Sequence, residues 1–312
     1  MKILVTGGAG FIGSHVVDAY VGAGHQVVVL DNLSTGKPGN VNPAATFYQL
    51  DIRAPELEEL LERVRPDVVN HHAAQINVRT SVADPLFDTS INVMGSIALL
   101  EACRKTGVRK VIYSSSGGAM YGEPEYLPCD EDHPVKPLSP YGANKHTVEH
   151  FLYMYRENFG LSYSVLRYPN VYGPRQDPFG EAGVIAIFAE RMLKGEDATI
   201  NGTGEQERDF IYVGDCVSAN LLCLEAGDGR EYNLGWGIGT TINEIFRRLK
   251  AITGYPWEAI YGPAKTGETF RIYLDTKRIR KELNWEPKVA LEEGLARTVD
   301  FFRERVRAEG AR

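Results

Sequence analysis

Cysteine and other metal ligands are scarce in this sequence and never occur in a paired spacing. The 312 residues contain four cysteines, and no two of them form a Cys-x-x-Cys pair. The adjacent histidines His71 and His72 have no third ligand at metal spacing, so no metal site is predicted. We expect buried free thiols at the four cysteine positions, Cys103, Cys129, Cys216 and Cys223.

Long apolar runs and clusters of basic residues are also missing. Only three apolar residues separate Lys2 from Thr6 and the first glycines, which matches neither a signal peptide nor a membrane anchor. The 34 basic and 41 acidic side chains give a formal net charge of −7, and no segment is strongly basic. We therefore expect a cytoplasmic protein without nucleic acid or membrane partners, in which local Arg or Lys side chains bind any anionic substrate.

The sequence does contain a regular alternation of apolar strand-like segments and amphipathic helix-like segments. Strands are predicted at residues 3–5, 27–30, 46–51, 67–74, 110–114 and 163–167. Helices are predicted between them at residues 14–22, 56–64, 85–105 and 141–159. This alternation predicts an α/β fold built on a doubly wound parallel sheet of the Rossmann type.

A glycine-rich turn follows the first predicted strand. Gly7, Gly10 and Gly13 form a Gly-x-x-Gly-x-x-Gly pattern between an apolar strand and a helix. Such a turn lets the backbone approach a pyrophosphate at a helix N-terminus. The second strand ends at Asp31, where a carboxylate can accept hydrogen bonds from an adenosine ribose and repel a 2′-phosphate. The pattern predicts NAD as the cofactor, in preference to NADP.

Tyr141 and Lys145 lie four residues apart in a predicted helix, so their side chains share one face. Ser139 is suited to the N-cap of this helix and Pro140 to its first position, which places the pair in the opening turns. An ammonium beside a tyrosine favours the phenolate and lowers the tyrosine pKa toward the range of a working base. A serine hydroxyl from residues 114–116 could share the proton.

After about residue 170 the alternation gives way to turns rich in glycine and proline. Helices predicted at 184–194, 215–224, 242–252 and 291–307 surround a strand at 208–213, without a low-complexity linker. We predict an NAD-binding domain over residues 1–169, to which residues 208–230 return. The rest of 170–312 is predicted to form a smaller, interleaved C-terminal substrate-binding domain.

These motifs resemble those of the extended short-chain dehydrogenase/reductase family over essentially the whole chain. Within the family they are most similar to the members that epimerise UDP-glucose at C4. The motifs that carry the resemblance are Gly7-x-x-Gly10-x-x-Gly13, Asp31-Asn32-Leu33-Ser34, Asp51-Ile52, the serines at 114–116, Tyr141-x-x-x-Lys145, the segment 167–174 and the segment 208–215.

The resemblance implies a role for each matching residue. Tyr141 would be the catalytic base, Lys145 would hold the nicotinamide ribose and lower the Tyr141 pKa, and Ser116 would share the proton of the substrate hydroxyl. The implied NAD contacts are Gly7, Gly10, Phe11, Ile12, Gly13, Asp31, Asn32, Ser34, Asp51, Ile52, Ala73, Gln75, Asn92, Ser114, Tyr141, Lys145 and Tyr168. The implied contacts of a nucleotide-sugar substrate are Ser116, Tyr141, Asn170, Arg208 and Lys265.

Two departures from the family pattern affect these roles. Counted forward from the strand, the catalytic serine of the family falls on Ser116; counted back from Tyr121 it falls on Gly117, and Ser115 is the alternative hydroxyl. The second departure is Lys265, where the family usually has arginine. A lysine can neutralise a phosphate as a point charge but cannot form a bidentate contact.

The activity implied by the resemblance is the interconversion of UDP-glucose and UDP-galactose by transient oxidation at C4. Alternatives of the same fold are a UDP-N-acetylglucosamine or UDP-glucuronate 4-epimerase, a decarboxylase and a 4,6-dehydratase. Family dehydratases carry Thr-Asp-Glu where this chain has Ser116, Gly117 and Gly118, which argues against elimination. Ile272 lies near the position that admits or excludes an N-acetyl group, and its intermediate size does not discriminate. A non-catalytic NAD-binding regulatory protein is the alternative from a different class.

The helix predicted at 141–159 also carries an apolar stripe with intervals of three and four residues. Together with the helix that follows Pro85, the stripe is predicted to form the four-helix contact of a homodimer. The residues of the stripe are Val148, Phe151, Leu152, Tyr155 and Phe159.

Overall fold

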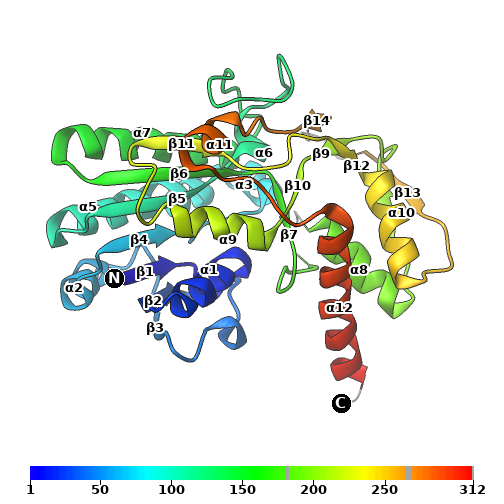
Figure 1. Cartoon of the computed structure of the whole chain (residues 1–312), viewed down its shortest axis with the longest axis horizontal. Helices are drawn as coiled ribbons and strands as arrows, with labels where there is room; N and C mark the ends of the chain where they lie inside the picture. Colours follow the sequence, from blue (N-terminus) through cyan, green and yellow to red (C-terminus); the bar gives the residue numbers. More distant parts are fainter. Residues whose placement is uncertain (180–182, 265–268, 311–312) are drawn as a thin grey trace.

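The main sheet of the protein has seven parallel strands in the order β11-β6-β5-β4-β1-β2-β3 (Figure 1). The structure is a computed structural model that describes residues 1–179, 183–264 and 269–310. This sheet confirms the predicted Rossmann-type fold. Its strands are β1 (Lys2–Thr6), β2 (Gln26–Asp31), β3 (Thr46–Gln49), β4 (Val68–His71), β5 (Lys110–Ser116), β6 (Ser162–Tyr168) and β11 (Arg230–Asn233).

Helices cover both faces of the sheet because alternate strand residues point to opposite sides. Ile3 and Val5 pack with α1 (Phe11–Gly22) and α9 (Val213–Leu222) on one face. Leu4 and Val28 pack on the other face with α2 (Leu57–Val64), α5 (Ser96–Thr106) and α7 (Pro140–Phe159). The four cysteines are buried and free, as predicted.

The predicted helix after Pro85 is continuous but changes its winding. It consists of α4 (Pro85–Thr89), a π-helical segment η2 (Ser90–Gly95) and α5. By length and composition alone this 22-residue stretch could cross a membrane, contrary to the expectation that the chain has no long apolar run. Half of its most apolar window is buried, and its fully buried positions include Asp88, Asn92 and Ser96. It packs against α2 and α7, as a core helix does.

Most of the remaining elements form a second lobe with short sheets (Figure 1). Helices α8 (Val184–Lys194), α10 (Ile242–Thr253) and α12 (Leu291–Gly310) pack on one another there. The short strands are β7 (Asn170–Tyr172), β8 (Thr199–Asn201), β9 (Glu207–Arg208), β10 (Phe210–Tyr212), β12 (Thr240–Thr241), β13 (Ile260–Gly262) and β14 (Arg271–Ile272). The other short helices are η1 (Pro38–Asn40), α3 (Val78–Ala83), α6 (Gly117–Met120) and α11 (Lys277–Leu283). Of these, α3 and α6 pack against α7 and α11 packs against β11, beside the main sheet.

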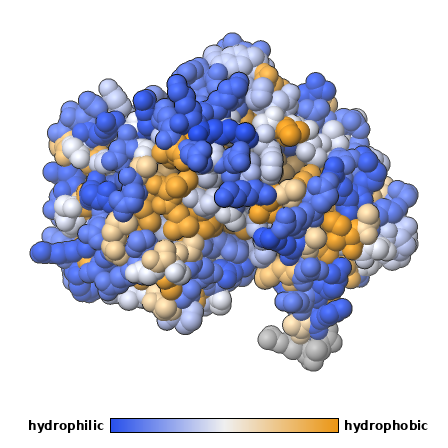
Figure 2. All heavy atoms as spheres, viewed as in Figure 1, coloured by the Kyte–Doolittle hydropathy of each residue, from blue (hydrophilic) through white to orange (hydrophobic). Residues whose placement is uncertain are grey.

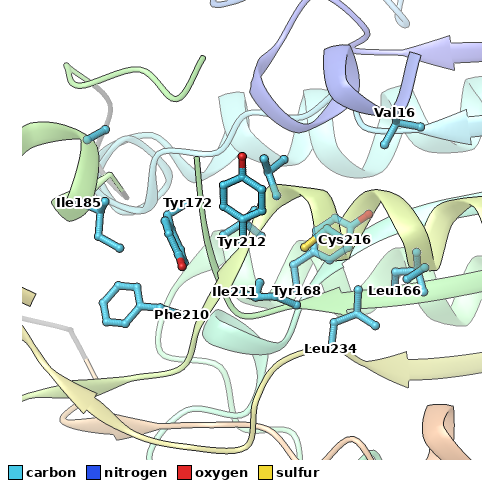
Figure 3. Close-up of a cluster of buried hydrophobic side chains, with 14 of the residues drawn as sticks. Val16, Leu166, Tyr168, Tyr172, Ile185, Phe210, Ile211, Tyr212, Cys216 and Leu234 are labelled. Atoms are coloured by element: carbon cyan, nitrogen blue, oxygen red, sulfur yellow. The ribbon is translucent and has the colours of Figure 1, made fainter. Parts of the chain in front are cut away.

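The two lobes share one hydrophobic cluster, which Figure 3 shows in close-up. Leu166 and Tyr168 of β6 belong to it together with Phe210 of β10 and Ile185 of α8. Because α9 and β11 lie on the main sheet, the chain returns to the first lobe after entering the second. The predicted domain boundaries stay a prediction, but this return extends at least to Asn233 rather than ending near residue 230.

Hydrophilic residues cover most of the molecular face seen in Figure 2. Apolar residues gather where α9 lies in Figure 1, and this helix is the short apolar helix of the described chain. Leu222 at its end is 39% exposed.

Candidate active site

The glycine-rich turn lies where the strand order of the main sheet reverses. β1 is flanked by β2 and β4, so the turn after β1 meets the end of β4, at the kind of switch point where doubly wound sheets bind ligands. Gly7 has φ of +68°, and a Cβ there would lie 2.7 Å from the backbone nitrogen of Ala73. A Cβ on Gly13 would lie 2.3 Å from the Gly7 carbonyl oxygen. Only glycine therefore permits this close crossing.

The N-terminus of α1 is suited to an anion. Its N-cap residue, Gly10, makes no side-chain cap hydrogen bond, and the first turn contains no acidic residue. The leading amides of a helix carry partial positive charge and need acceptors. These amides, at Phe11, Ile12 and Gly13, together with the glycine turn, fit the diphosphate of a dinucleotide.

Asp31 lies at the end of β2, beside the glycine turn. Its carboxylate accepts hydrogen bonds from the backbone amides of Ala9 (3.0 Å) and Leu33 (2.8 Å). A Cβ on Gly36 would lie 2.7 Å from Asp31 Oδ1, so the glycine keeps the space beside the carboxylate free. Each carboxylate oxygen retains accepting capacity, and the arrangement fits a ribose with free hydroxyls.

The predicted adenosine residues form a connected group beside Asp31. The Asn32 side-chain amide donates to Asp51 (2.8 Å), and its carbonyl oxygen accepts from the Ser34 amide (2.9 Å). Arg53 donates to Asp51 (2.9 Å) and, through this hydrogen bond, holds the pKa of that carboxyl well below its usual range. Ile52 is buried, so its side chain is part of the core at this edge.

The residues predicted for the nicotinamide side meet at the end of β4. Ala73 donates its amide to Thr6 Oγ1 (3.2 Å). The Gln75 amide donates to Asn92 Oδ1 and Asn92 Nδ2 donates back to the Gln75 carbonyl, both at 2.9 Å. Tyr168 is buried, and its hydroxyl accepts from Asn220 Nδ2 (2.7 Å). Tyr168 therefore offers its ring rather than its hydroxyl to this region.

The start of α7 is built as the sequence predicts. Ser139 Oγ accepts from the Gly142 amide (3.2 Å), and Pro140 is the first residue of the helix. A Cβ on Gly142 would lie 2.3 Å from the Ala119 carbonyl oxygen, so a glycine is needed for α7 to approach the segment that follows β5. The Tyr141 amide donates to Ser81 Oγ (3.2 Å), a contact from α3, which the sequence patterns did not predict.

The geometry separates the three candidate positions for the catalytic hydroxyl. Ser116 ends β5, and its side chain lies close enough to Tyr141 to lower the pKa of that phenol. Ser115 points to the opposite side, where its hydroxyl donates to Glu149 (2.6 Å) inside the protein. A Cβ at Gly117 would lie 2.5 Å from Leu274 Cδ1, so that position has no room for a side chain unless Leu274 moves. Ser116 is thus the serine that the structure brings to Tyr141.

The predicted electrostatic effect on Tyr141 is not what the structure shows. Burial raises the Tyr141 pKa to about 12, and the nearby Ser116 side chain only partly offsets this rise. Lys145 does not produce the expected lowering of the Tyr141 pKa. Lys145 Nζ donates to the Ser114 carbonyl oxygen (2.7 Å) and lies 4.7 Å from the centroid of the Tyr113 ring. Burial also lowers the pKa of Lys145 to about 8.

A buried ion pair beneath the site was not predicted. Arg167 Nη2 lies 2.6 Å from Glu149 Oε2, and both side chains are at most 6% exposed. Arg167 also donates to the Tyr121 hydroxyl (3.0 Å). Glu149 lies four residues after Lys145, on the same helix face, so the spacing contained a signal for it. The pair anchors α7 to β6 below the candidate catalytic residues.

The predicted substrate residues are only partly placed. Asn170 begins β7, and its Oδ1 would lie 3.7 Å from a Cβ on Gly118, so it adjoins the segment after Ser116. Arg208 in β9 donates to the carbonyl oxygens of Glu207 and Phe270 (2.9 and 3.2 Å). Lys265 lies outside the described residues.

Comparison with known proteins assigns this arrangement to a family. The family model of the NAD dependent epimerase/dehydratase family matches residues 3–235. The chain belongs to this family. The predicted family, fold and NAD cofactor are thereby confirmed.

Relatives of this epimerase/dehydratase chain match it over nearly its full length. It is 50% identical to a putative UDP-glucose 4-epimerase of Methanocaldococcus jannaschii, over 96% of this chain and 98% of that protein. It is 46% identical to the UDP-glucose 4-epimerase of Mycolicibacterium smegmatis, over 97% and 99%. The crystal structure of Thermotoga maritima UDP-glucose 4-epimerase with UDP-glucose aligns with a TM-score of 0.97 at 51% identity, covering 98% of this chain and all of that one.

Proposed function

We propose that the protein interconverts UDP-glucose and UDP-galactose by epimerisation at C4. The observation that carries the proposal is the meeting of Ser116, Tyr141 and Lys145 at the edge of the sheet that also bears the glycine turn. The relatives described above support UDP-glucose as the substrate. Asn170, Arg208 and Lys265 are the proposed contacts of the uridine diphosphate.

The proposed mechanism assigns each step of proton handling to a named side chain. Bound NAD supplies the chemistry of accepting a hydride from C4 and returning it to the opposite face. Tyr141 takes the proton of the 4-hydroxyl, and Ser116, whose side chain lies beside the phenol, shares that proton. Lys145 is held by the Ser114 carbonyl oxygen and would bind the nicotinamide ribose. Binding of the nucleotide portion holds the sugar in place between the two hydride transfers.

An NMR assay of the purified protein with separate UDP-hexoses tests the proposal. UDP-glucose is expected to give UDP-galactose, with inversion at C4 and no loss of carbon or water. Conversion of only UDP-N-acetylglucosamine or UDP-glucuronate would assign a different 4-epimerase activity. A 4-keto-6-deoxy product or a pentose would assign a dehydratase or a decarboxylase, and no conversion of any substrate would favour the regulatory alternative.

Removal of the Asp31 charge is expected to change the cofactor preference. Asp31→Ala should weaken NAD binding and bring NADP binding closer to it, because the repulsion of the 2′-phosphate disappears. Asp31→Asn tests the effect of the charge alone, because its side chain has nearly the same shape and its amide oxygen can still accept from Ala9 or Leu33. Calorimetric binding of both cofactors to both variants is the measurement. An unchanged ratio of the two affinities in both variants would refute the assignment.

A homodimer is part of the proposed function, but through different residues from those predicted. Val148, Leu152 and Tyr155 face the core of their own subunit, and Phe159 is 53% exposed under Arg104. The stripe is therefore not the proposed contact surface. The packed helices α5 and α7 lie side by side (Figure 1), and their region instead exposes the apolar side chains of Leu86, Met94 and Met154.

Met94→Glu with Met154→Glu is expected to convert a dimer into a monomer. In a dimer that uses this surface, the two new carboxylates would be buried without a partner, which would destabilise the contact. Sedimentation at micromolar concentration is the measurement. Ile260→Glu is the control, because Ile260 is 45% exposed on β13 in the other lobe and should leave the dimer intact. A monomeric wild-type protein with full activity would remove the prediction.

The cytoplasm is the proposed location. Four buried cysteines without a disulfide are compatible with a reducing compartment. The absence of nucleic acid and membrane partners stays an expectation from the net charge of −7.

A further inference from the structure

A carboxylate that the proposed mechanism does not use lies fully buried beside the catalytic helix. Asp88 of α4 is 0% exposed. Its Oδ1 accepts from Gln75 Nε2 (2.6 Å) and from Asn92 Nδ2 (3.1 Å). Its Oδ2 accepts from Asn144 Nδ2 (2.7 Å). A buried carboxylate is costly unless its oxygens are hydrogen-bonded, and here three side-chain amides from three segments satisfy them.

These hydrogen bonds join two parts of the candidate active site. Gln75 and Asn92 belong to the predicted nicotinamide side, where they also bond to each other. Asn144 immediately precedes Lys145 on α7, so its amide connects the carboxylate to the helix that carries the catalytic pair. The π-helical turn of η2 contains Asn92 and follows α4 directly, and such turns widen a helix locally so that side chains can be redirected.

The amides satisfy the hydrogen-bonding capacity of Asp88 but do not neutralise its charge. The negative charge of Asp88 acts on both Lys145 and Tyr141. Burial lowers the Lys145 pKa to about 8, and the negative charges of Asp88 and, to a smaller extent, Glu149 oppose this lowering. Asp88 also raises the pKa of Tyr141. In water a lysine is fully protonated at neutral pH, but a buried lysine needs such a counter-charge to stay so.

We propose that Asp88 is a positioning residue of this site with two linked effects. It ties Gln75 and Asn92 to the catalytic helix through Asn144, and its negative charge keeps Lys145 protonated at neutral pH. The proposal rests on the proposed function only in taking Tyr141 and Lys145 as the working pair. Catalytic contact is not assigned to Asp88, because its oxygens are occupied by the three amides.

The groups around Lys145 show why a single carboxylate can be the main counter-charge of its ammonium. The ring of Tyr113 on β5 lies next to its ammonium. His71 and His72 on β4 are buried with lowered pKa values, to which Lys145 itself contributes, so both are neutral at pH 7. The other carboxylate, Glu149, is already paired with Arg167. Among the described residues, Asp88 therefore differs from Glu149, because its hydrogen-bond partners are neutral amides and not a cation.

Asp88→Asn removes the charge and can keep the hydrogen bonds. The new amide oxygen would still accept from Gln75 and Asn92, while its NH2 group would face Asn144. Asn144 can rotate its amide by half a turn to present its oxygen, because Thr89 Oγ1, which now accepts from Asn144 Nδ2 (3.0 Å), can donate instead. Asp84→Asn is the matched control. Asp84 is the exposed N-cap residue of α4, and asparagine caps equally well.

The first measurement is the Lys145 pKa, by NMR titration of lysine-labelled, cofactor-free protein with the signal assigned through a Lys145 variant. Asp88→Asn is expected to lower this pKa by about one unit, and Asp84→Asn to leave it unchanged. The second is the pH dependence of kcat/KM for UDP-glucose. Both limbs should move to lower pH by about one unit in Asp88→Asn, because the carboxylate raises the pKa of Tyr141 and of Lys145 alike.

A restoring variant separates charge from structure. Asp88→Asn with Asn144→Asp returns one carboxylate to the same pair and should restore the Lys145 pKa; it is also the variant to titrate if Asp88→Asn alone does not fold. An unchanged Lys145 pKa in Asp88→Asn, or a lowered one in the double variant, would overturn the proposal. A lower rate with unmoved limbs would leave only a structural role and would also overturn it. The titration needs no substrate, so failure of the epimerase assignment would be seen separately.

Discussion

Tyr141→Phe is expected to lower kcat by about 100-fold to 10,000-fold, the usual contribution of a positioned base, while the fold and NAD binding persist. The change removes one oxygen atom from a half-buried side chain at the start of α7. The Tyr141 amide keeps its bond to Ser81, and the Ser139 cap is untouched. Only the proton acceptor beside Ser116 is lost.

The pH dependence gives this prediction a second measurable consequence. With the Tyr141 pKa raised to about 12 by burial, the phenol is neutral at pH 7 in the cofactor-free protein. Activity should therefore rise with pH on the acidic limb, and the limb should lie well below 12 in the holoenzyme, because cationic nicotinamide favours the phenolate. Tyr153→Phe is the control, since Tyr153 is 57% exposed on the same helix. Turnover of Tyr141→Phe within about tenfold of wild type would show that another group is the base.

Lys145→Met is expected to abolish most turnover and yet to stabilise the cofactor-free protein at pH 7. The lysine is 4% exposed, and burial lowers its pKa from 10.5 to about 8. A shift of this size corresponds to about 3 kcal/mol of destabilisation by the charged form. Loss of the hydrogen bond to the Ser114 carbonyl oxygen costs about 1 kcal/mol. The free energy of unfolding of Lys145→Met is therefore expected to exceed that of the wild type by about 2 kcal/mol.

Because the Lys145 pKa is lower in the folded protein than in the unfolded chain, the destabilisation is largest at low pH. Below pH 8 the lysine is protonated in both the folded and the unfolded protein, and the destabilisation is fully present. Between pH 8 and 10.5 the unfolded chain binds more protons than the folded one, so wild-type stability rises with pH. The advantage of Lys145→Met should accordingly shrink over this range in urea unfolding measurements.

Lys110→Met is the matched comparison for this prediction. Lys110 is also fully buried, but its ammonium bonds to the Ala226 carbonyl oxygen and pairs with Asp228. Its replacement should destabilise the protein, because a satisfied buried charge and its hydrogen bonds are lost. If Lys145→Met were as destabilising as Lys110→Met, burial of the charged Lys145 would not destabilise the folded protein.

Local patterns in the sequence were sufficient for the architecture and for the positions of the motifs. Alternating apolar segments predicted the parallel sheet, because parallel strands need helical crossovers. The glycines at 7, 10 and 13 and the Ser139-Pro140 helix start depend on backbone geometry within a few residues, which sequence spacing encodes directly. The glycine turn and Asp31 also predicted NAD, and the family resemblance added the residue roles.

Tertiary structure alone decided the features that depend on which distant groups are buried together. It selected Ser116 over Ser115 and Gly117, since the space at each position is set by Glu149 and Leu274. It turned most of the predicted dimer stripe toward the subunit core and reversed the predicted direction of the Tyr141 pKa shift. Burial of Asp88 among three amides has little local sequence signal, because only Asn92 lies within one helical turn and the other two partners are 13 and 56 residues away. Desolvation and packing depend on the whole fold, whereas turns, caps and strand periodicity depend on neighbours in the chain.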